Sequence, residues 1–151
     1  MVYLLISVVN GKSVVPLNRS GRVELVRTKR RLIAIVDDDE HVRESISRLM
    51  RSLGFTAETF SSANEFLSSP QVGQTACLIA DVQMPEMSGF DLYFELSKLG
   101  KKIPTVLITA YPTENDRSRA RDVGIVSYLA KPFAEADLLE GVHTALSSST
   151  E

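Results

Sequence analysis

The sequence predicts an α/β fold in which five parallel strands form one doubly wound sheet, flanked by five helices. Short apolar runs alternate with segments of helical periodicity, and the runs occupy residues 32–36, 55–60, 77–81, 104–109 and 125–129. Runs of this length, bounded by Gly, Pro or Asp, are typical of buried strands. Regular alternation of strands and helices predicts right-handed crossovers and a parallel sheet that is covered on both faces.

The first strand and helix set the pattern. Residues 32–36 are continuously apolar, as expected of a central parallel strand. A helix is predicted from about Glu40 to Leu53, because apolar residues recur at helical spacing in Val42, Ile46, Leu49 and Leu53. Gly54 stands where glycine commonly ends a helix.

The second and third strands follow in the same order. Residues 55–60 form a shorter strand, and Ser62 with Glu65 has the spacing of a capping box that opens a short helix. The third strand ends at Asp81. A loop with Pro85 then leads to an amphipathic helix predicted over residues 89–99.

The last part of the chain adds two more strand and helix units. A strand over 104–109 precedes a polar helix that either Thr113 or Asn115 can cap, and that helix ends near Gly124. A fifth strand over 125–129 precedes a final helix over 134–146. We expect a polar tail over 147–151.

Residues 1–31 form a basic N-terminal extension. This segment contains seven basic residues and one acidic residue, a formal charge of +6; since the whole chain is −2, the remainder carries −8. Asn10-Gly11 between β-rich runs predicts a hairpin, and a disordered leader is the alternative. The basic cluster 27–31 would then be a solvated linker. The acidic remainder argues against direct nucleic-acid binding.

The composition fits one globular domain with a sizeable core: 151 residues, 44% of them hydrophobic. The single cysteine, Cys77, lies inside a predicted strand and has no internal disulfide partner. No apolar stretch is long enough to span a bilayer. We therefore expect a cytoplasmic protein with no membrane contact.

Reactive side chains stand at the ends of four of the five predicted strands. They are Asp37 and Asp38, Asp81, Thr109, and Lys131. Parallel topology brings the carboxyl ends of strands to one edge of the sheet, where ligands bind in such folds. Crowded carboxylates suit a Mg²⁺ ion, and a carboxylate can also act as a nucleophile toward phosphorus. A hydroxyl and an ammonium suit the oxygens of a transferring phosphoryl group.

The chain resembles the receiver domain of two-component response regulators, in particular the FixJ-like receivers. The resemblance covers about residues 32–146 and is carried by four pieces in order: IVDDDE at 35–40, DVQMPEMSG at 81–89, ITA at 108–110 and YLAKPF at 128–133. It implies a flavodoxin-like or CheY-like fold with strand order 2-1-3-4-5. It also implies a signalling domain that assists its own phosphorylation and dephosphorylation, and not a metabolic enzyme.

The resemblance assigns the phosphoacceptor and the metal ligands. It makes Asp81 the residue that is phosphorylated. Asp38 would bind Mg²⁺ directly, Asp37 chiefly through water, and Gln83 through its backbone carbonyl. Asp81 would complete this metal site.

It likewise assigns the residues that contact the phosphoryl group and respond to it. Thr109 and Lys131 would contact phosphoryl oxygens, and the Lys131-Pro132 peptide bond would be cis. Thr109 and Tyr128 would form the switch, moving inward on phosphorylation. A plain half-buried aromatic is the alternative for Tyr128.

The resemblance further implies partners and an output. A sensor histidine kinase would supply the phosphoryl group, and the face of the fourth helix, fifth strand and fifth helix could form a homodimer in transcriptional regulation. Arg117, Arg119 and Arg121 are expected on a solvated face near this surface. Two alternatives are a degenerate receiver that acts only as an interaction module, and a phosphohydrolase. The phosphohydrolase is disfavoured because Gln83 stands where a second Asp is expected.

Overall fold

The chain divides into two compact units, one of residues 1–30 and one of residues 31–151. The computed structural model describes residues 7–9, 12–15, 24–27 and 30–148. Each unit is described by itself.

The first unit contains a small antiparallel sheet. Its strands are β1 (Ser7–Val9), β2 (Lys12–Val15) and β3 (Glu24–Arg27), paired in the order β1-β2-β3. β1 and β2 flank Asn10-Gly11, the two residues predicted to turn the chain, which lie outside the described residues.

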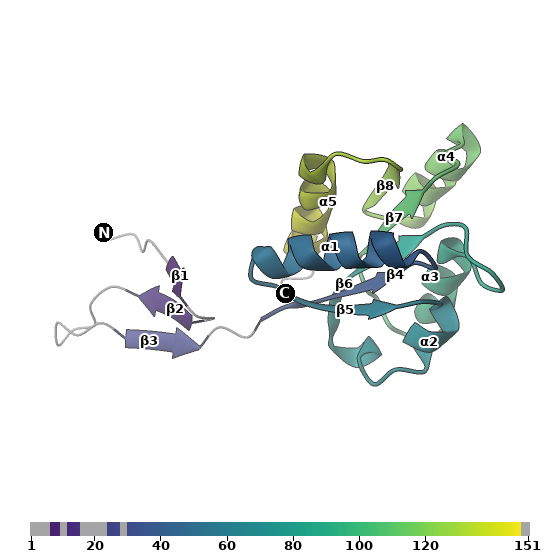
Figure 1. Cartoon of the computed structure of the whole chain (residues 1–151). Coiled ribbons are helices and arrows are strands. Elements are labelled where there is room, and N and C mark those ends of the chain that lie inside the picture. Colours follow the sequence, from purple (N-terminus) through teal and green to yellow (C-terminus); the bar gives the residue numbers. More distant parts are fainter. Residues whose placement is uncertain (1–6, 10–11, 16–23, 28–29, 149–151) are drawn as a thin grey trace. The chain divides into compact units, whose positions relative to one another are not determined.

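The second unit is built on one parallel sheet of five strands (Figure 1). The strands are β4 (Leu32–Val36), β5 (Thr56–Phe60), β6 (Thr75–Asp81), β7 (Thr105–Thr109) and β8 (Ser127–Ala130). They lie in the order β5-β4-β6-β7-β8. Numbered within this unit, that order is 2-1-3-4-5, so the predicted fold class and strand order are confirmed.

In the described part of the second unit, five α-helices and one short 3₁₀ helix alternate with the strands. They are α1 (Glu40–Ser52), α2 (Ala63–Leu67), η1 (Val72–Gln74), α3 (Gly89–Lys98), α4 (Glu114–Val123) and α5 (Glu135–Ser148). α5 runs two residues beyond its predicted end, so Ser147 and Ser148 belong to the helix and not to a polar tail.

Side-chain caps explain where several helices begin. Thr113, and not Asn115, caps α4 by accepting a hydrogen bond from Asp116 N. Ser62 accepts one from Glu65 N, but the Glu65 carboxylate returns to Ser61 N and Oγ. In the predicted capping box Glu65 would accept from the N–H of the cap, Ser62. It accepts instead from the residue before the cap, Ser61.

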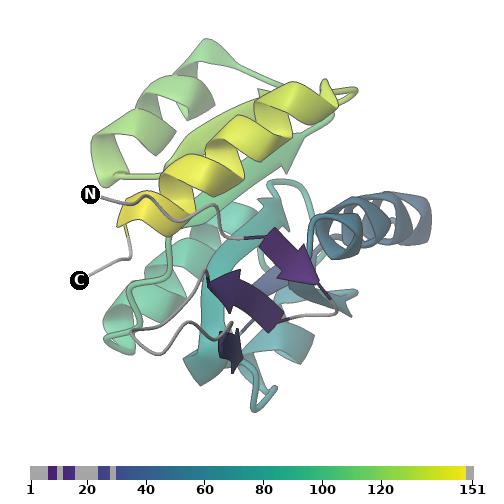
Figure 2. The ribbon, with the colours of Figure 1, turned by 90° about the vertical axis from the view of Figure 1, so that its left-hand side faces the viewer.

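The helices cover both faces of the sheet (Figures 1 and 2). α1 and α5 pack on one face through a core that contains Ile46, Met50, Leu138 and Val142. α2, α3 and α4 pack on the other through Phe66, Phe90, Leu92, Leu96 and Ala120. Cys77 is fully buried within β6, and burial raises the pKa of its thiol to about 12, so it acts as a small core residue.

Arg117, Arg119 and Arg121 are exposed on α4, as predicted, and two of them also pack on aromatic rings. The Arg117 guanidinium carbon lies 5.1 Å from the ring centre of Tyr128. That of Arg119 lies 4.3 Å from Phe90 and 5.4 Å from Phe94. The apolar stems and flat guanidinium groups allow these side chains to cover rings while staying hydrated.

The expectation of a solvated basic cluster before β4 is wrong for its last residue. The Arg31 guanidinium donates a hydrogen bond of 3.0 Å to the Leu146 carbonyl of α5, and the Arg31 carbonyl accepts one from Thr56 N. Arg31 thus belongs to the second unit and is not solvated linker. Among the described residues, no helix is long and apolar enough to cross a membrane.

Candidate functional site

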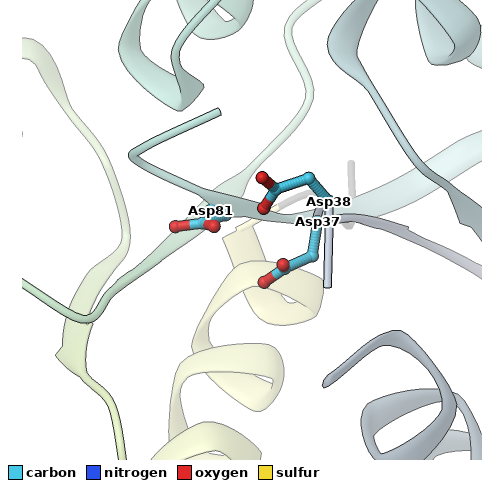
Figure 3. Close-up of side chains that lie close together, drawn as sticks. All are labelled: Asp37, Asp38 and Asp81. Carbon is cyan, nitrogen blue, oxygen red and sulfur yellow. The ribbon is translucent and has the colours of Figure 1, made fainter. Parts of the chain in front are cut away.

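The carboxyl ends of the strands bring three carboxylates together at one edge of the sheet. Asp37 and Asp38 directly follow β4, and Asp81 is the last residue of β6 (Figure 3). Each of the three offers a carboxylate oxygen, and these oxygens all lie within 4.8 Å of one another. The side chains predicted to gather here do so because β4 and β6 are neighbouring parallel strands.

The turn after β4 fixes Asp37 and leaves Asp38 free to face solvent. Asp37 is 0% exposed, its Oδ1 accepts a hydrogen bond of 2.8 Å from Asp39 N, and its own N–H donates to the Phe60 carbonyl. Asp39 accepts bonds from His41 N and Val42 N, so it caps α1 as a capping acid should. Asp38 is exposed.

Asp81 ends β6 and precedes a tight loop that leads to α3. It is 4% exposed, and its Oδ1 accepts a hydrogen bond of 3.2 Å from Gln83 N. Gly89 begins α3 directly against this loop. A Cβ added there would lie 2.6 Å from the Asp81 carbonyl oxygen and 2.9 Å from Leu107 Cδ2. Only a residue without a side chain allows this close approach.

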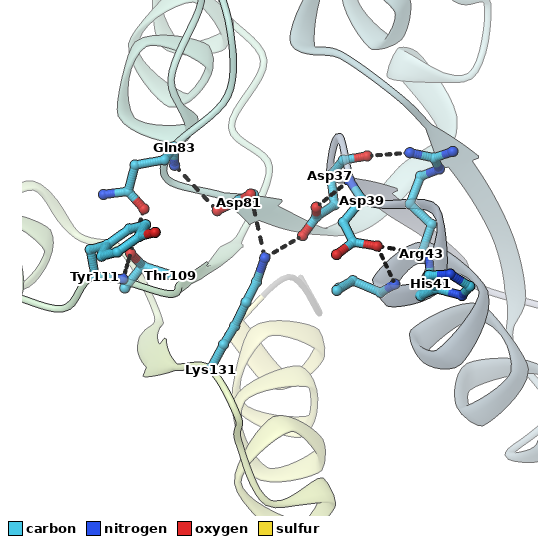
Figure 4. Close-up of polar contacts among 10 residues, drawn as sticks. Asp37, Asp39, His41, Arg43, Asp81, Gln83, Thr109, Tyr111 and Lys131 are labelled. Atoms are coloured by element: carbon cyan, nitrogen blue, oxygen red, sulfur yellow. Dashed lines mark hydrogen bonds and ion pairs between the residues drawn. The ribbon is translucent and has the colours of Figure 1, made fainter.

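Lys131 reaches into the acidic cluster from the end of β8 (Figure 4). The Lys131-Pro132 bond is cis, as predicted. Lys131 N donates a hydrogen bond of 2.7 Å to the Thr109 carbonyl. The ammonium Nζ lies 2.9 Å from Asp37 Oδ2 and 3.4 Å from Asp81 Oδ2, so one cation pairs with two carboxylates.

The pKa values of Asp81 and Lys131 are both raised above their ordinary values. Burial, followed by the charge of Asp37, raises the pKa of Asp81 to about 6, although Lys131 and the N–H of Gln83 oppose the rise. Burial alone would lower the pKa of Lys131, but its hydrogen bond to Asp37 and the two negative charges outweigh burial and raise it. The cluster therefore carries more negative charge than one ammonium offsets.

The donor set fits a hard divalent cation. Three carboxylates, two of them buried, supply the oxygen ligands that Mg²⁺ prefers, and the exposed Asp38 leaves one side open to water. A bound cation would also offset the charge of Asp37, which adds to the burial that raises the pKa of Asp81. Asp37, Asp38 and Asp81 are therefore the residues able to hold a metal ion here.

Thr109 is placed at the same edge, but its hydroxyl is directed elsewhere. Thr109 is fully buried at the end of β7, and its Oγ1 donates a hydrogen bond of 2.7 Å to Gln83 Oε1. The same oxygen accepts a bond of 3.0 Å from Tyr111 N. Figure 4 shows the Gln83 amide pointing toward Thr109 and not toward the Asp81 carboxylate.

Tyr128 lies in β8 and contacts the start of α4. It is 7% exposed, and its hydroxyl oxygen accepts a hydrogen bond of 3.3 Å from the N–H of Thr113, the cap of α4. Arg117 covers its ring and donates to the Tyr128 carbonyl. Any movement of this side chain therefore changes contacts at the start of α4.

Two residues near the site were not predicted from the sequence. Arg43 of α1 donates a hydrogen bond of 2.7 Å to the Asp37 carbonyl; a basic residue four positions after the cap Asp39 was its available signal. Glu86 has a φ of 71° in the β6–α3 loop, and its carboxylate accepts a bond from Asn64 of α2. A glutamate gives no signal for a positive φ, which Gly or Asn would have given.

Known proteins resemble this chain in sequence. Residues 33–143 match the family described as response regulator receiver domain. The chain is 45% identical over 117 residues to response regulator protein TmoT of Ectopseudomonas mendocina, covering 76% of this chain and 52% of that protein. It is 31% identical to transcriptional regulatory protein FixJ of Azorhizobium caulinodans, covering 79% and 56% of the two chains.

Solved structures of response regulators have a similar fold. The crystal structure of FixJ-N superposes with a TM-score of 0.73 at 30% identity, covering 82% of this chain and 99% of that one. The response regulator StyR superposes with a TM-score of 0.72 at 38% identity, covering 80% and 61%. The chain spans about half the length of the curated relatives that it matches. From the matched residues, the fold and the clustered site, the chain belongs to the response regulator receiver domain family.

Proposed function

We propose that this chain is a cytoplasmic phosphoacceptor that takes a phosphoryl group from a sensor histidine kinase onto Asp81. The observation that carries the proposal is the meeting of Asp37, Asp38 and Asp81 with the single ammonium of Lys131. The names of the relatives, which are response and transcriptional regulators, support a role in transcriptional regulation.

The chemistry is a transfer between two nucleophiles. A carboxylate oxygen of Asp81 attacks phosphorus, an O–P bond forms, and the N–P bond to the donor histidine breaks, so that the imidazole leaves with the electron pair. Mg²⁺, when bound, would offset charge on the phosphoryl oxygens. Asp37, Asp38 and Asp81 would hold it, together with the backbone carbonyl of Gln83.

The remaining site residues stabilise the product. Lys131 would donate to one phosphoryl oxygen. Its ammonium lies 2.9 Å from Asp37 Oδ2 and 3.4 Å from Asp81 Oδ2, which supports this role. Thr109 would donate its hydroxyl proton to another oxygen. To do so, the hydroxyl must leave Gln83 and turn toward Asp81.

The switch would pass from Thr109 to the surface through Tyr128. In this structure Tyr128 is bonded to the cap of α4 and covered by Arg117. An inward movement of the ring would release both contacts and change the face of α4, β8 and α5. Phosphorylation would then act by favouring one of two conformations, with a homodimer on this face as its output.

An apolar groove beside Lys131 supports the kinase as partner. α1 contributes Val42, Ile46 and Leu49 to its lining, and Phe133 and Leu138 line it from the other side. His41 lies at its edge and is exposed, which fits a surface residue and not a metal ligand. The part of the kinase that carries the phosphohistidine would pack here, with its histidine directed at Asp81.

Beryllofluoride binding followed by amide NMR tests the proposal. Beryllofluoride with Mg²⁺ mimics the phosphoryl group on a carboxylate, so saturable shifts are expected at Asp81, Thr109 and Lys131, spreading to Tyr128. The shifts should vanish with EDTA and in Asp81→Asn. Glu58→Gln, an exposed acid on β5, is the matched control and should respond as the wild type does.

The same titration decides between the proposal and its alternative. A degenerate receiver that acts only as an interaction module would show no saturable response to beryllofluoride at any Mg²⁺ concentration. That result, obtained with a folded protein, would overturn the phosphoacceptor proposal and leave the interaction module.

A further inference from the structure

Gln83 is bonded to both the phosphoacceptor and the switch hydroxyl. Its backbone N–H donates a hydrogen bond of 3.2 Å to Asp81 Oδ1. Its side-chain carbonyl accepts one of 2.7 Å from Thr109 Oγ1. The side chain of Gln83 is exposed, whereas Thr109 is fully buried, so the amide closes over the hydroxyl from the solvent side.

The bonds of Thr109 use the only proton that its hydroxyl can donate. A threonine hydroxyl has one proton to donate, and here that proton goes to Gln83. Its oxygen also accepts from Tyr111 N at 3.0 Å. A phosphoryl oxygen is an acceptor only, so Thr109 can bind one only by taking its proton away from Gln83.

We propose that the Gln83 side chain is a latch that holds Thr109 in the unphosphorylated arrangement and so lowers the fraction of free molecules in the active conformation. The inference rests on the proposed function, because it assumes that Thr109 moves toward a phosphoryl group on Asp81. Gln83 acts as a positioning residue, through Thr109, and its role is separate from that of its backbone carbonyl.

The relative strengths of the competing bonds make the latch reversible. A hydrogen bond between a hydroxyl and a neutral amide carbonyl is about half as strong as one to a charged oxygen. The Thr109 hydroxyl therefore donates to a phosphoryl group on Asp81 in preference to Gln83. The exposed Gln83 amide, once released, can rotate toward solvent and hydrogen-bond to water. Without a phosphoryl group, the Gln83 carbonyl is the acceptor that the Thr109 hydroxyl reaches in this structure.

Two substitutions that remove the accepting carbonyl test the latch. Gln83→Leu keeps the bulk of the side chain and Gln83→Ala does not, so an effect common to both belongs to the lost hydrogen bond. At saturating Mg²⁺ we expect both variants to bind beryllofluoride roughly fivefold more tightly than the wild type. Gln74→Leu, an exposed glutamine in η1, is the matched control and should not change the affinity.

A readout without ligand separates the latch from a simple change in access to the site. In free Gln83→Leu, the Thr109 methyl and Tyr128 ring signals should move part of the way toward their positions in the beryllofluoride complex of the wild type. In a Thr109→Val background the latch is absent, so adding Gln83→Leu should leave the affinity unchanged.

Three results of these experiments would overturn the latch, and they differ in what they leave of the proposed function. Equal or weaker binding by both Gln83 variants, in a wild type that binds beryllofluoride, overturns the latch and leaves the phosphoacceptor function intact. A fivefold gain that persists in the Thr109→Val background also overturns it, because the gain cannot then pass through the hydroxyl. Failure of the wild type to bind at all overturns the proposed function and the latch together.

Discussion

The ammonium of Lys131 lies 2.9 Å from Asp37 Oδ2, although the two residues are 94 positions apart in the chain. The contact ties the loop after β8 to the turn after β4, across the two strands that separate them in the sheet. Asp81, at 3.4 Å from the same ammonium, lies between these two ends. The site therefore contributes to holding the edge of the sheet together, besides its chemistry.

Lys131→Met should destabilise the protein when no metal is bound. Removing one partner of a largely buried pair leaves uncompensated charge, and the side chain of Lys131 is only 17% exposed. We expect the free energy of unfolding at pH 7.5 in EDTA to fall by about 2 kcal/mol, as measured in urea. Added Mg²⁺ should restore more stability to this variant than to the wild type.

Lys101→Met is the control for the lysine substitution, because Lys101 is exposed in the loop before β7. Its stability should stay within about 0.5 kcal/mol of the wild type. An equal loss in both variants, or no loss in Lys131→Met, would refute a structural role for the Lys131 ion pairs.

Asp81→Asn should stabilise the metal-free protein at neutral pH and not at pH 4. The folded protein holds the pKa of Asp81 at about 6, above the ordinary 3.8, so between these values it binds more protons than the unfolded chain. Its stability therefore falls as pH rises through this window. Replacing the carboxylate should add between about 1 and 3 kcal/mol at pH 7.5, as measured by urea unfolding in EDTA.

The comparison of pH values serves as the internal control for Asp81→Asn. At pH 4 Asp81 is protonated in the folded wild type, so the two proteins should unfold at the same urea concentration. Asp122→Asn on the exposed side of α4 should show no difference at either pH. A stabilisation of equal size at pH 4 would contradict the electrostatic explanation.

Gly89→Ala should destabilise the fold, because its Cβ would overlap the Asp81 carbonyl oxygen and Leu107. A loss of about 1 to 3 kcal/mol in the free energy of unfolding is expected from such overpacking. Gly73→Ala is the matched control, since a Cβ there meets nothing within 4 Å. The steric explanation fails if the two alanine variants are equally stable.

Glu86→Gly should be more stable than Glu86→Ala. Glu86 has a φ of 71°, where a residue with a Cβ is strained and glycine is not. Both variants lose the hydrogen bond from Asn64, so the difference between their stabilities reports the backbone strain alone. In thermal unfolding Glu86→Gly should be more stable than Glu86→Ala by about 1 kcal/mol. Lys102 is an exposed loop residue without a positive φ and serves as the control. There the alanine variant should be at least as stable as the glycine variant.

The fold could be predicted because the local patterns and the topology agree. Five apolar runs between helical segments leave few arrangements, and the ends of parallel strands must meet at one edge. Asp37, Asp38, Asp81, Thr109 and Lys131 were predicted at that edge for this reason. The strand limits differ by a residue or two, because hydrogen bonding and not hydropathy decides where a strand begins.

Side-chain directions could not be predicted, because they depend on contacts between distant segments. Nothing in the sequence indicates that Thr109 donates to Gln83, or that Arg117 covers Tyr128. The same holds for Arg31, whose bond to the Leu146 carbonyl joins residues 115 positions apart. Charge and periodicity describe one segment at a time, and these contacts join two.

Phosphorylation by acetyl phosphate tests the central claim most directly. The folded wild type, incubated with acetyl phosphate and Mg²⁺, should gain one phosphoryl group by intact mass, and reduction with borohydride should locate it at Asp81. Asp81→Asn, shown to be folded by circular dichroism, should gain none. Equal labelling of Asp81→Asn, or a phosphoryl group on another residue of the wild type, would contradict the assignment of Asp81 as phosphoacceptor.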